Sequence, residues 1–285
     1  MKKYFLFAAS LAWLASCSND DLNIDNTKDT PITIQSAGVA ELTARAISDN
    51  NELVGTDANN TATMSVFVTN GSTDKYKASN VKWTHDGTSW TSEKTVLFEG
   101  AGSTQKIFAC SPYAGTDATE NITVTAADQI DWLVATTTSL TSNSVELTMT
   151  HALAKLVLIP SFGTELNGNN TITFVKVGSM YASGTLNIST NEWSEQVVAN
   201  APLTMTNNEL LVIPMAQCAS FSITVATGDN RTFATTISLA EVNNELAAGT
   251  QYNIKLQIGQ NKVELGGITA TSWGTSVEGG NLVTE

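Results

Sequence analysis

The chain has 285 residues, of which 42% are hydrophobic and only 14% are charged. This hydrophobic content can build a core, which excludes a disordered protein. The formal net charge of −13 repels phosphate backbones and anionic lipid headgroups, so nucleic-acid binding is also excluded. The length suits one large domain or two of ordinary size.

Residues 1–16 have the pattern of a secretory signal peptide, because two lysines precede an apolar run too short to span a bilayer. The run ends in "LASC", which resembles a bacterial lipobox. That resemblance implies cleavage before Cys17 and a lipid on its thiol. Ser18 in the next position is typical of a lipoprotein of the outer membrane. The alternative is an ordinary signal peptide followed by a chance cysteine.

Residues 17–45 are interpreted as a polar tether followed by a removable N-terminal strand. In "TPITIQSAGVAEL" (30–42), the alternation of Ile32 and Ile34 predicts a strand at the edge of a sandwich. The small residues of this segment predict that the strand is loosely packed. The segment ends at Arg45, one of only two arginines in the chain, the other being Arg231.

From residue 46 onward the chain is a succession of strand signals. "TATMSVFVT" (61–69) alternates, and "VKWTHDGTSW" (81–90) predicts a hairpin that turns at Asp86-Gly87. "ALAKLVLIPSF" (152–162) fits a helix or a buried strand, and its β-branched neighbours and Pro160 favour the strand. The many short strands predict an all-β protein of two antiparallel β-sandwich domains, 46–150 and 151–285.

Neither histidine lies in a pattern that indicates chemistry. His85 lies beside a predicted turn and His151 at the start of a predicted strand near the domain junction, and neither has cysteines or carboxylates at metal-ligand spacing. No G-x-S-x-G segment indicates a nucleophile elbow. We therefore predict no metal, no cofactor and no enzymatic activity, with both histidines in structural roles.

The cysteines and tryptophans are interpreted as core residues. Cys110 and Cys218 are far apart in the sequence, which favours two buried free thiols over a disulfide. Core positions are favoured over a sugar-binding platform for the tryptophans of the mature chain, which are Trp83, Trp90, Trp132, Trp193 and Trp273.

Four segments occur in the order and spacing of one family. They are "FACSPY", "DWLVATT", "VELTMTHALAKLVL" and "QYNIKLQIGQNKVELGGITATSWG". The chain resembles the fimbrillin-like lipoproteins, which are subunits of type V pili in anaerobic Gram-negative bacteria. The resemblance implies two tandem transthyretin-like sandwiches, an arginine-specific protease that removes an N-terminal segment, and polymerisation by strand exchange with other pilin subunits.

On this basis we predict a structural pilin subunit of a cell-surface fimbria that serves adhesion, cut between Arg45 and Ala46. The C-terminal segment "ITATSWGTSVEGGNLVTE" is a candidate donor strand, although Trp273 and several glycines interrupt its alternation. The alternative is a monomeric surface lipoprotein or tip adhesin that binds glycan or another cell. That alternative predicts a ligand cleft bordered by Trp193 or Trp132.

Overall fold

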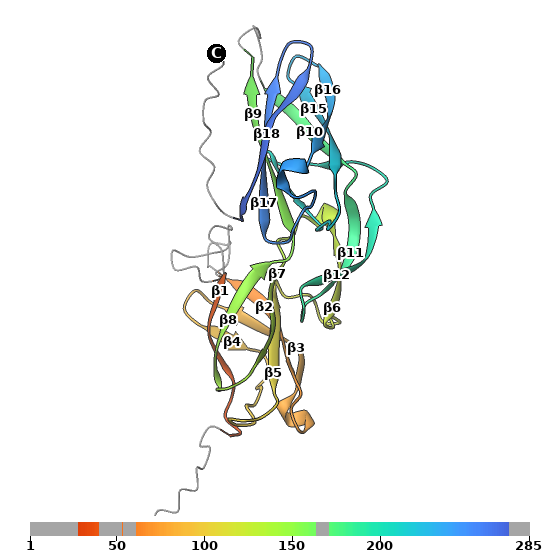
Figure 1. Ribbon diagram of the computed structural model, residues 1–285. Coiled ribbons are helices and arrows are strands. Elements are labelled where there is room, and N and C mark those ends of the chain that lie inside the picture. Colours follow the sequence, from red (N-terminus) through yellow and green to blue (C-terminus); the bar gives the residue numbers. More distant parts are fainter. Residues whose placement is uncertain (1–27, 40–52, 54–60, 164–170, 274–285) are drawn as a thin grey trace, which may run out of the picture.

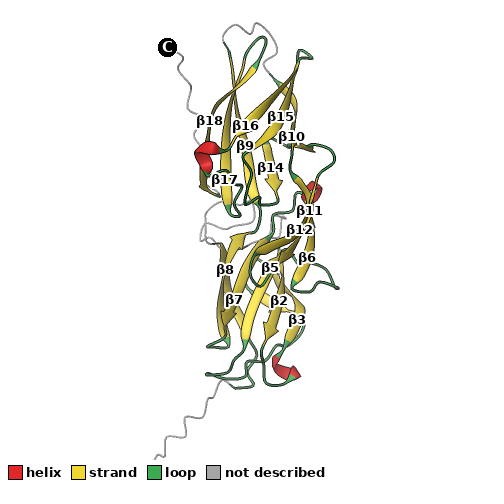
Figure 2. Cartoon of the chain, turned by 45° about the vertical axis from the view of Figure 1, so that its right-hand side comes forward, coloured by secondary structure: helices red, strands yellow, loops and turns green. Residues whose placement is uncertain are grey.

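The computed structural model describes residues 28–39, 53, 61–163 and 171–273. Cys17, Arg45, Ala46 and the segment 274–285 lie outside the described residues. Within them the chain forms eighteen strands and three short 3₁₀ helices, the latter at Asp74–Tyr76, Ala126–Asp128 and Ala240–Val242 (Figure 2). The predicted all-β class is therefore confirmed. None of these helices is long and apolar enough to cross a membrane.

The N-terminal half forms a seven-stranded sheet in the order β1-β8-β7-β5-β2-β3-β4 (Figure 1). β1 runs parallel to β8, and the other neighbours are antiparallel. In sheet order the strands are β1 (Thr33–Val39), β8 (Ser144–His151), β7 (Leu133–Ser139), β5 (Lys106–Ser111), β2 (Ala62–Thr69), β3 (Ala78–His85) and β4 (Trp90–Ser92).

One face of this sheet encloses a hydrophobic cluster that we call the N-terminal core. Its largest fully buried members are Leu53, Met64, Phe98, Ile107 and Met149. The two ends of the sheet approach each other, because the Ile32 N–H donates to the Val96 carbonyl at 2.8 Å and the Phe98 N–H donates to the Thr30 carbonyl at 2.8 Å. The chain before β1 thus meets the chain that follows β4.

The local sequence explains β2 and the β3–β4 hairpin. On β2, Met64 and its alternate neighbours face the N-terminal core as predicted, while Phe67 faces the opposite side and stacks on Phe108 with centroids 4.9 Å apart. The hairpin is confirmed as well. Gly87 has φ 92°, and Asp86 Oδ1 accepts hydrogen bonds of 2.9 Å from the Thr88 and Ser89 N–H groups.

The C-terminal half forms a sandwich of two four-stranded sheets, in the orders β13-β10-β15-β16 and β14-β9-β17-β18. The prediction of a strand over 152–162 is confirmed by β9, which pairs parallel with β17 and antiparallel with β14. The strands are β13 (Leu203–Thr204), β10 (Ile172–Gly178), β15 (Ser220–Thr227), β16 (Thr232–Ser238), β14 (Glu209–Val212), β9 (Ala154–Phe162), β17 (Thr250–Ile258) and β18 (Val263–Ser272).

The space between these two sheets is filled by what we call the C-terminal core. Its largest fully buried members are Leu156, Met180, Leu210, Phe221 and Tyr252. Inward-facing residues alternate with polar outward-facing ones along β15, where serine and threonine occupy the outer positions. This is the pattern of an antiparallel sheet with one face packed on the core and the other exposed to solvent.

A third sheet, in the order β12-β11-β6, joins the two halves. Its strands are β6 (Asn121–Thr125), β11 (Tyr181–Asn187) and β12 (Glu192–Val198). Behind it lies the junction core, whose large members are Phe67, Phe108, Trp132, Leu186, Ile188 and Trp273. Both the sheet and this core combine residues from either side of position 150. The division into 46–150 and 151–285 and the transthyretin-like topology stay predictions.

Candidate functional site at the N-terminal edge strand

β1 occupies one end of the seven-stranded sheet and packs its apolar side chains into the N-terminal core. Ile34 is 4% exposed, Ala37 0% and Val39 2%, whereas Gln35 faces solvent. The buried positions shift phase between Ile34 and Ala37, because the register with β8 is irregular between Ile34 and Ser36. A bulge there supplies the extra residue.

β1 is held along both of its edges. The residues just before it, Thr30 and Ile32, pair with Phe98 and Val96, and near the other end of β1 the Leu53 N–H donates to the Ala37 carbonyl at 2.9 Å. The opposite edge pairs with β8 over Ser144 to Met149. The prediction of a loosely packed strand is therefore wrong for the described residues. The small side chain of Ala37 instead allows complete burial against the core.

The start of this segment is anchored through Asp29. The Lys75 ammonium donates to Asp29 Oδ1 at 2.8 Å, and the Tyr76 hydroxyl donates to the same oxygen at 2.6 Å. Both hydrogen bonds, the one from Lys75 first, lower the pKa of the Asp29 carboxyl below its usual value. Half of each charged side chain is exposed, so solvent screens this pair.

The predicted cleavage site falls between two anchored points of the backbone. The described part of β1 ends at Val39, and Leu53 returns to pair with Ala37. Arg45 and Ala46 belong to residues 40–52, outside the described residues. The chain order alone dictates that a cut at this position would separate β1 from every later strand.

Several contacts hold the side chain of the second arginine, Arg231. Arg231 Nε donates to Asp229 Oδ2 at 2.7 Å, and Nη1 donates to the carbonyls of Gly259 at 3.1 Å and Gln260 at 2.5 Å. Its guanidinium also lies 5.3 Å from the centre of the Phe233 ring. The side chain is 27% exposed. These contacts hold Arg231 in a fixed position on the folded surface.

Both histidines are buried. The Gly87 N–H donates to His85 Nδ1 at 3.2 Å, and the His85 ring lies against Trp90. His151 stacks on Trp273 with centroids 4.0 Å apart, and its Nδ1 lies 2.9 Å from Asp131 Oδ1. Among the described residues, no group of three or more His, Cys, Asp and Glu could hold a metal ion.

Sequence reasoning missed the partnership of Asp131 with His151. The two residues are twenty positions apart and come together because β7 and β8 pair antiparallel, with Leu133 opposite His151. The register of this β-hairpin could have indicated the pair, because residues at the two open ends of a hairpin lie side by side. One-dimensional ligand spacing does not reveal such a pair.

Cys110 and Cys218 are both buried and free, as predicted. Burial raises the pKa of the Cys110 thiol to about 12 and also raises that of Cys218. Trp132 and Trp273 lie in the junction core, which confirms their prediction as core residues. Trp193 is partly buried, and its ring N–H donates to the Ala152 carbonyl at 3.1 Å.

Two stacked regions of mostly antiparallel sheet joined by a shared core define a β-sandwich protein. The chain matches the fimbrillin-like family model over residues 44–273 and therefore belongs to that family. The resemblance seen in the sequence is thus confirmed. A comparison with curated proteins finds no match.

Solved structures share the fold. A candidate cell adhesion protein from Bacteroides uniformis is 20% identical with a TM-score of 0.67, covering 85% of this chain and 98% of its own. One from Bacteroides ovatus is 18% identical with a TM-score of 0.63, covering 88% and 99%. A fimbrial protein from Bacteroides vulgatus is 15% identical with a TM-score of 0.51, covering 85% and 99%.

Proposed function

We propose that this protein is a structural pilin subunit of a cell-surface fimbria that serves adhesion. Membership of the fimbrillin-like family supports this, as does the shared fold with proteins described as fimbrial or as candidate adhesion proteins. The signal peptide and lipobox pattern support export to the outer membrane as a lipoprotein anchored through Cys17.

We further propose that the subunit assembles by strand exchange after an arginine-specific protease cuts between Arg45 and Ala46. The observation that carries this proposal is the position of β1 as the end strand of its sheet, with its apolar side chains sealing the N-terminal core. Loss of β1 would uncover that core and leave the β8 backbone from Ser144 to Met149 unpaired. Each orphaned buried group costs about 1–3 kcal/mol.

A strand from another subunit would restore those bonds by β-augmentation. The candidate donor is the C-terminal segment 274–285, which continues directly from β18 and Trp273. Before cleavage β1 has the advantage of being part of the same chain, which gives it a high effective concentration at the groove. The cut removes this advantage, so that an incoming strand competes with β1 on equal terms.

The contacts of Arg231 support a single cut. A protease must draw an extended stretch of backbone into its active site, and Arg231 is held by Asp229 and by two carbonyl groups of the neighbouring turn. Breaking these contacts requires local unfolding. Arg45 is then the arginine that the protease cuts in the folded protein.

The test is digestion of the folded full-length chain with an arginine-specific protease. We expect one product that begins at Ala46 and forms filaments visible by negative-stain microscopy. Arg45→Ala should stay uncut and monomeric, whereas the matched variant Arg231→Ala should be cut and should polymerise like the wild type. Resistance of the wild type, or trimming without polymerisation, would overturn the proposal.

The lipid anchor has a separate test. Labelled palmitate should enter the wild-type protein in a Gram-negative host and should be absent from Cys17→Ala. A Cys110→Ala variant serves as the control, because its cysteine is buried in the folded protein and should not change labelling. Equal labelling of the wild type and Cys17→Ala would contradict the assignment.

A further inference from the structure

β1 buries its side chains at uneven intervals. Ile34 is 4% exposed, Ala37 0% and Val39 2%, while Gln35 faces solvent. The buried positions are therefore separated by three residues and then by two, whereas a regular strand buries every second residue. Because Ala37 is fully buried, the middle position holds a small side chain.

A β-bulge accounts for the interval of three. Two steps along β1, from Ile34 to Ser36, match one step along β8, from Val145 to Glu146. Gln35 is therefore the extra residue of the bulge. The bulge brings the later side chains of β1 into phase with β8, whose buried residues alternate regularly.

The C-terminal segment 274–285, "GTSVEGGNLVTE", has the same uneven spacing. Its first two large apolar residues, Val277 and Leu282, are separated by the same interval as Ile34 and Val39 of β1. When Val277 is put in the place of Ile34, Leu282 therefore falls in the place of Val39. Both ends of the buried stretch then receive a large apolar side chain.

The residues between these two match β1 as well. Glu278 takes the place of the solvent-facing Gln35, and Gly280 takes that of the fully buried Ala37. Gly279 directly follows the position of the extra residue, where glycine adapts readily to the backbone of a bulge. The glycines that interrupt the alternation of this segment thus fall where β1 has its bulge and its smallest buried side chain.

Other registers fit less well. A shift by one residue in one direction puts Glu278 in the place of Ile34. The opposite shift puts Asn281 in the place of Val39, and strict alternation from Val277 without a bulge also buries Asn281. Each of these registers transfers a charge or an amide into the N-terminal core, which is unfavourable.

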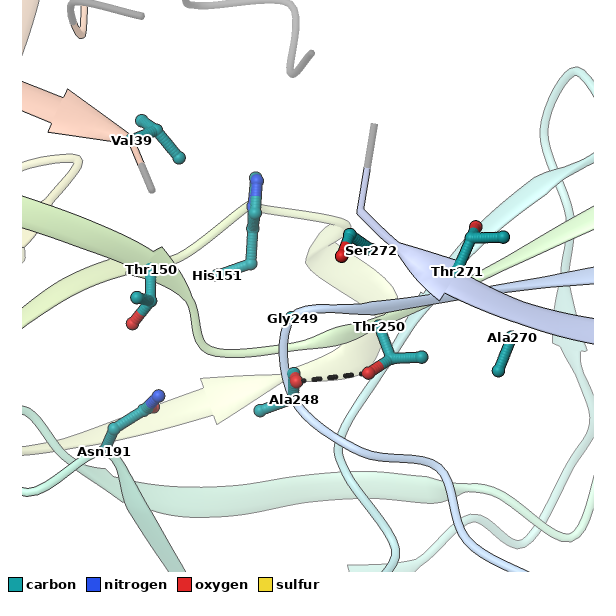
Figure 3. Close-up of a pocket in the computed structure, with 10 residues that line it drawn as sticks. All are labelled: Val39, Thr150, His151, Asn191, Ala248, Gly249, Thr250, Ala270, Thr271 and Ser272. Atoms are coloured by element: carbon teal, nitrogen blue, oxygen red, sulfur yellow. Dashed lines mark hydrogen bonds between the residues drawn. The ribbon is translucent and has the colours of Figure 1, made fainter. Parts of the chain in front are cut away.

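The end of β1 and the end of β18 lie at the same place in the molecule. They meet at a cavity of about 490 Å³, where Val39 and Ser272 lie on either side of His151 (Figure 3). The cavity is bordered by the end of β1, the end of β8, the turn between β11 and β12, the start of β17 and the end of β18. The C-terminal segment of a chain therefore begins near the Val39 end of that chain's own β1.

Entry parallel to β8 has to begin at the opposite end of β1. In the register above, Thr275 takes the place of Ile32, which lies about 23 Å from Val39 along an extended strand. From Trp273, Thr275 reaches at most about 7 Å. Trp273 is 2% exposed in the junction core, and its N–H donates to the Gly249 carbonyl at 3.1 Å. A chain with this anchor cannot place its own segment in this register.

We propose that the C-terminal segment of a second copy of this chain replaces β1 parallel to β8, with Val277 and Leu282 in the N-terminal core and Glu278 as the extra residue of a bulge. This register rests on the proposed strand exchange and adds the identity of the partner. Only Gly274 separates Thr275 from the buried Trp273. The β18 end of the donor copy therefore lies against the start of the β1 site of the acceptor copy.

The first test compares the filaments that full-length variants form after digestion with an arginine-specific protease. Val277→Asp should form none, because it carries a carboxylate into the N-terminal core of the acceptor. Ser276→Asp is the matched control, since Ser276 takes the place of the exposed Thr33, and it should polymerise like the wild type. Gly280→Leu should form few filaments, whereas Gly280→Ala should polymerise, because β1 itself has alanine at that position.

The second test measures binding of the segment directly. The cut Val277→Asp protein keeps the acceptor site but lacks a competent donor, so it should stay monomeric and bind a labelled 274–285 peptide in fluorescence anisotropy. An unlabelled 30–39 peptide should compete, because it contains β1. The Gly280→Leu peptide should bind about tenfold more weakly or worse. The uncut protein, in which β1 occupies the site, should not bind the peptide.

The outcomes separate this register from the proposed function. Filaments of Val277→Asp that equal those of the wild type, equal loss in Ser276→Asp and Val277→Asp, or peptide binding without competition from the 30–39 peptide would each overturn the register alone. A wild type that resists the protease, or that is cut and stays monomeric, would overturn the proposed strand exchange and this register with it.

Discussion

The two strands β1 and β18 both end a sheet, but they contribute to the fold in different ways (Figure 1). β1 has seven residues, runs parallel to β8 and seals the N-terminal core. β18 has ten residues, runs antiparallel to β17 and buries only Val263 and Ile268 in the C-terminal core. β1 therefore contributes core side chains, whereas β18 mainly lies over the edge of its sheet.

Connectivity explains the difference. β17 and β18 form a hairpin closed by a bond from the Gly259 N–H to the Lys262 carbonyl at 2.9 Å, so they fold as a local unit. β1 pairs with β8 from more than a hundred residues away in the sequence. It stabilises the fold through burial of its side chains rather than through pairing with a neighbouring segment. The proposed exchange of a strand between subunits would use this second kind of edge.

The largest expected effect is that of a charge placed under β1. Ile34→Asp would bury a carboxylate in the N-terminal core without a partner, and should lower the free energy of unfolding by about 3–5 kcal/mol. Gln35→Asp puts the same charge on the solvent side of the same strand and should have little effect. Urea unfolding of both variants measures the change in the free energy of unfolding. Equal decreases in the two variants would mean that the Ile34 side chain does not seal the N-terminal core.

The second effect compares the thiols of the two halves. The pKa of Cys110 is raised to about 12 by burial, so its folded form keeps its proton while the unfolded chain ionises. Stability from this group is complete below the unfolded pKa of about 8.5 and falls as pH rises toward 12. In Cys110→Ala the free energy of unfolding should fall less as pH rises over this range, as measured by urea unfolding at several pH values.

Thiol labelling sharpens the same comparison. Cys218 is 5% exposed and Cys110 is 0% exposed, so a thiol reagent should modify Cys218 first and Cys110 only on opening of the junction core. Mass spectrometry of partly labelled protein identifies the order. Earlier modification of Cys110 would show that the junction core opens more readily than the C-terminal sandwich.

The third effect concerns the β18 edge. Gly267 has φ 138° where the register with β17 shifts, and no heavy atom lies near the place of an added Cβ. Gly267→Ala should therefore cost about 1–2 kcal/mol through backbone strain alone. Gly266→Ala, one residue earlier and without a positive φ, should be close to neutral. Thermal unfolding separates the two, and similar losses would contradict the assignment of strain to Gly267.

The smallest effect is at the anchor of the β1 segment. The pKa of Asp29 is lowered by its bonds to Lys75 and Tyr76, so it stabilises the fold above its unfolded pKa and this contribution is lost as pH falls through the folded value. Asp29→Asn should slightly reduce acid sensitivity, measured by unfolding near pH 3–4. Asp74→Asn removes a comparable exposed pair with Lys77 and should not change the protection of β1 in hydrogen exchange.

The amino-acid sequence by itself determined the features that depend on short stretches of chain. The alternation of β2, the turn at Asp86-Gly87, the strand character of β9 and the burial of Cys110 and Cys218 were all predictable. Side-chain periodicity and turn preferences act within about ten residues, so no distant partner is needed to interpret them.

Only the tertiary structure decided which distant segments meet. The parallel pairing of β1 with β8, the bond between Asp131 and His151 and the junction sheet that joins β6 to β11 leave no mark in local periodicity. The cavity beside His151 depends on five separate elements. Distant segments meet where the free energy gained by burying apolar side chains exceeds the entropy lost in closing the long loops between them. That difference depends on the whole chain and cannot be read from a short stretch.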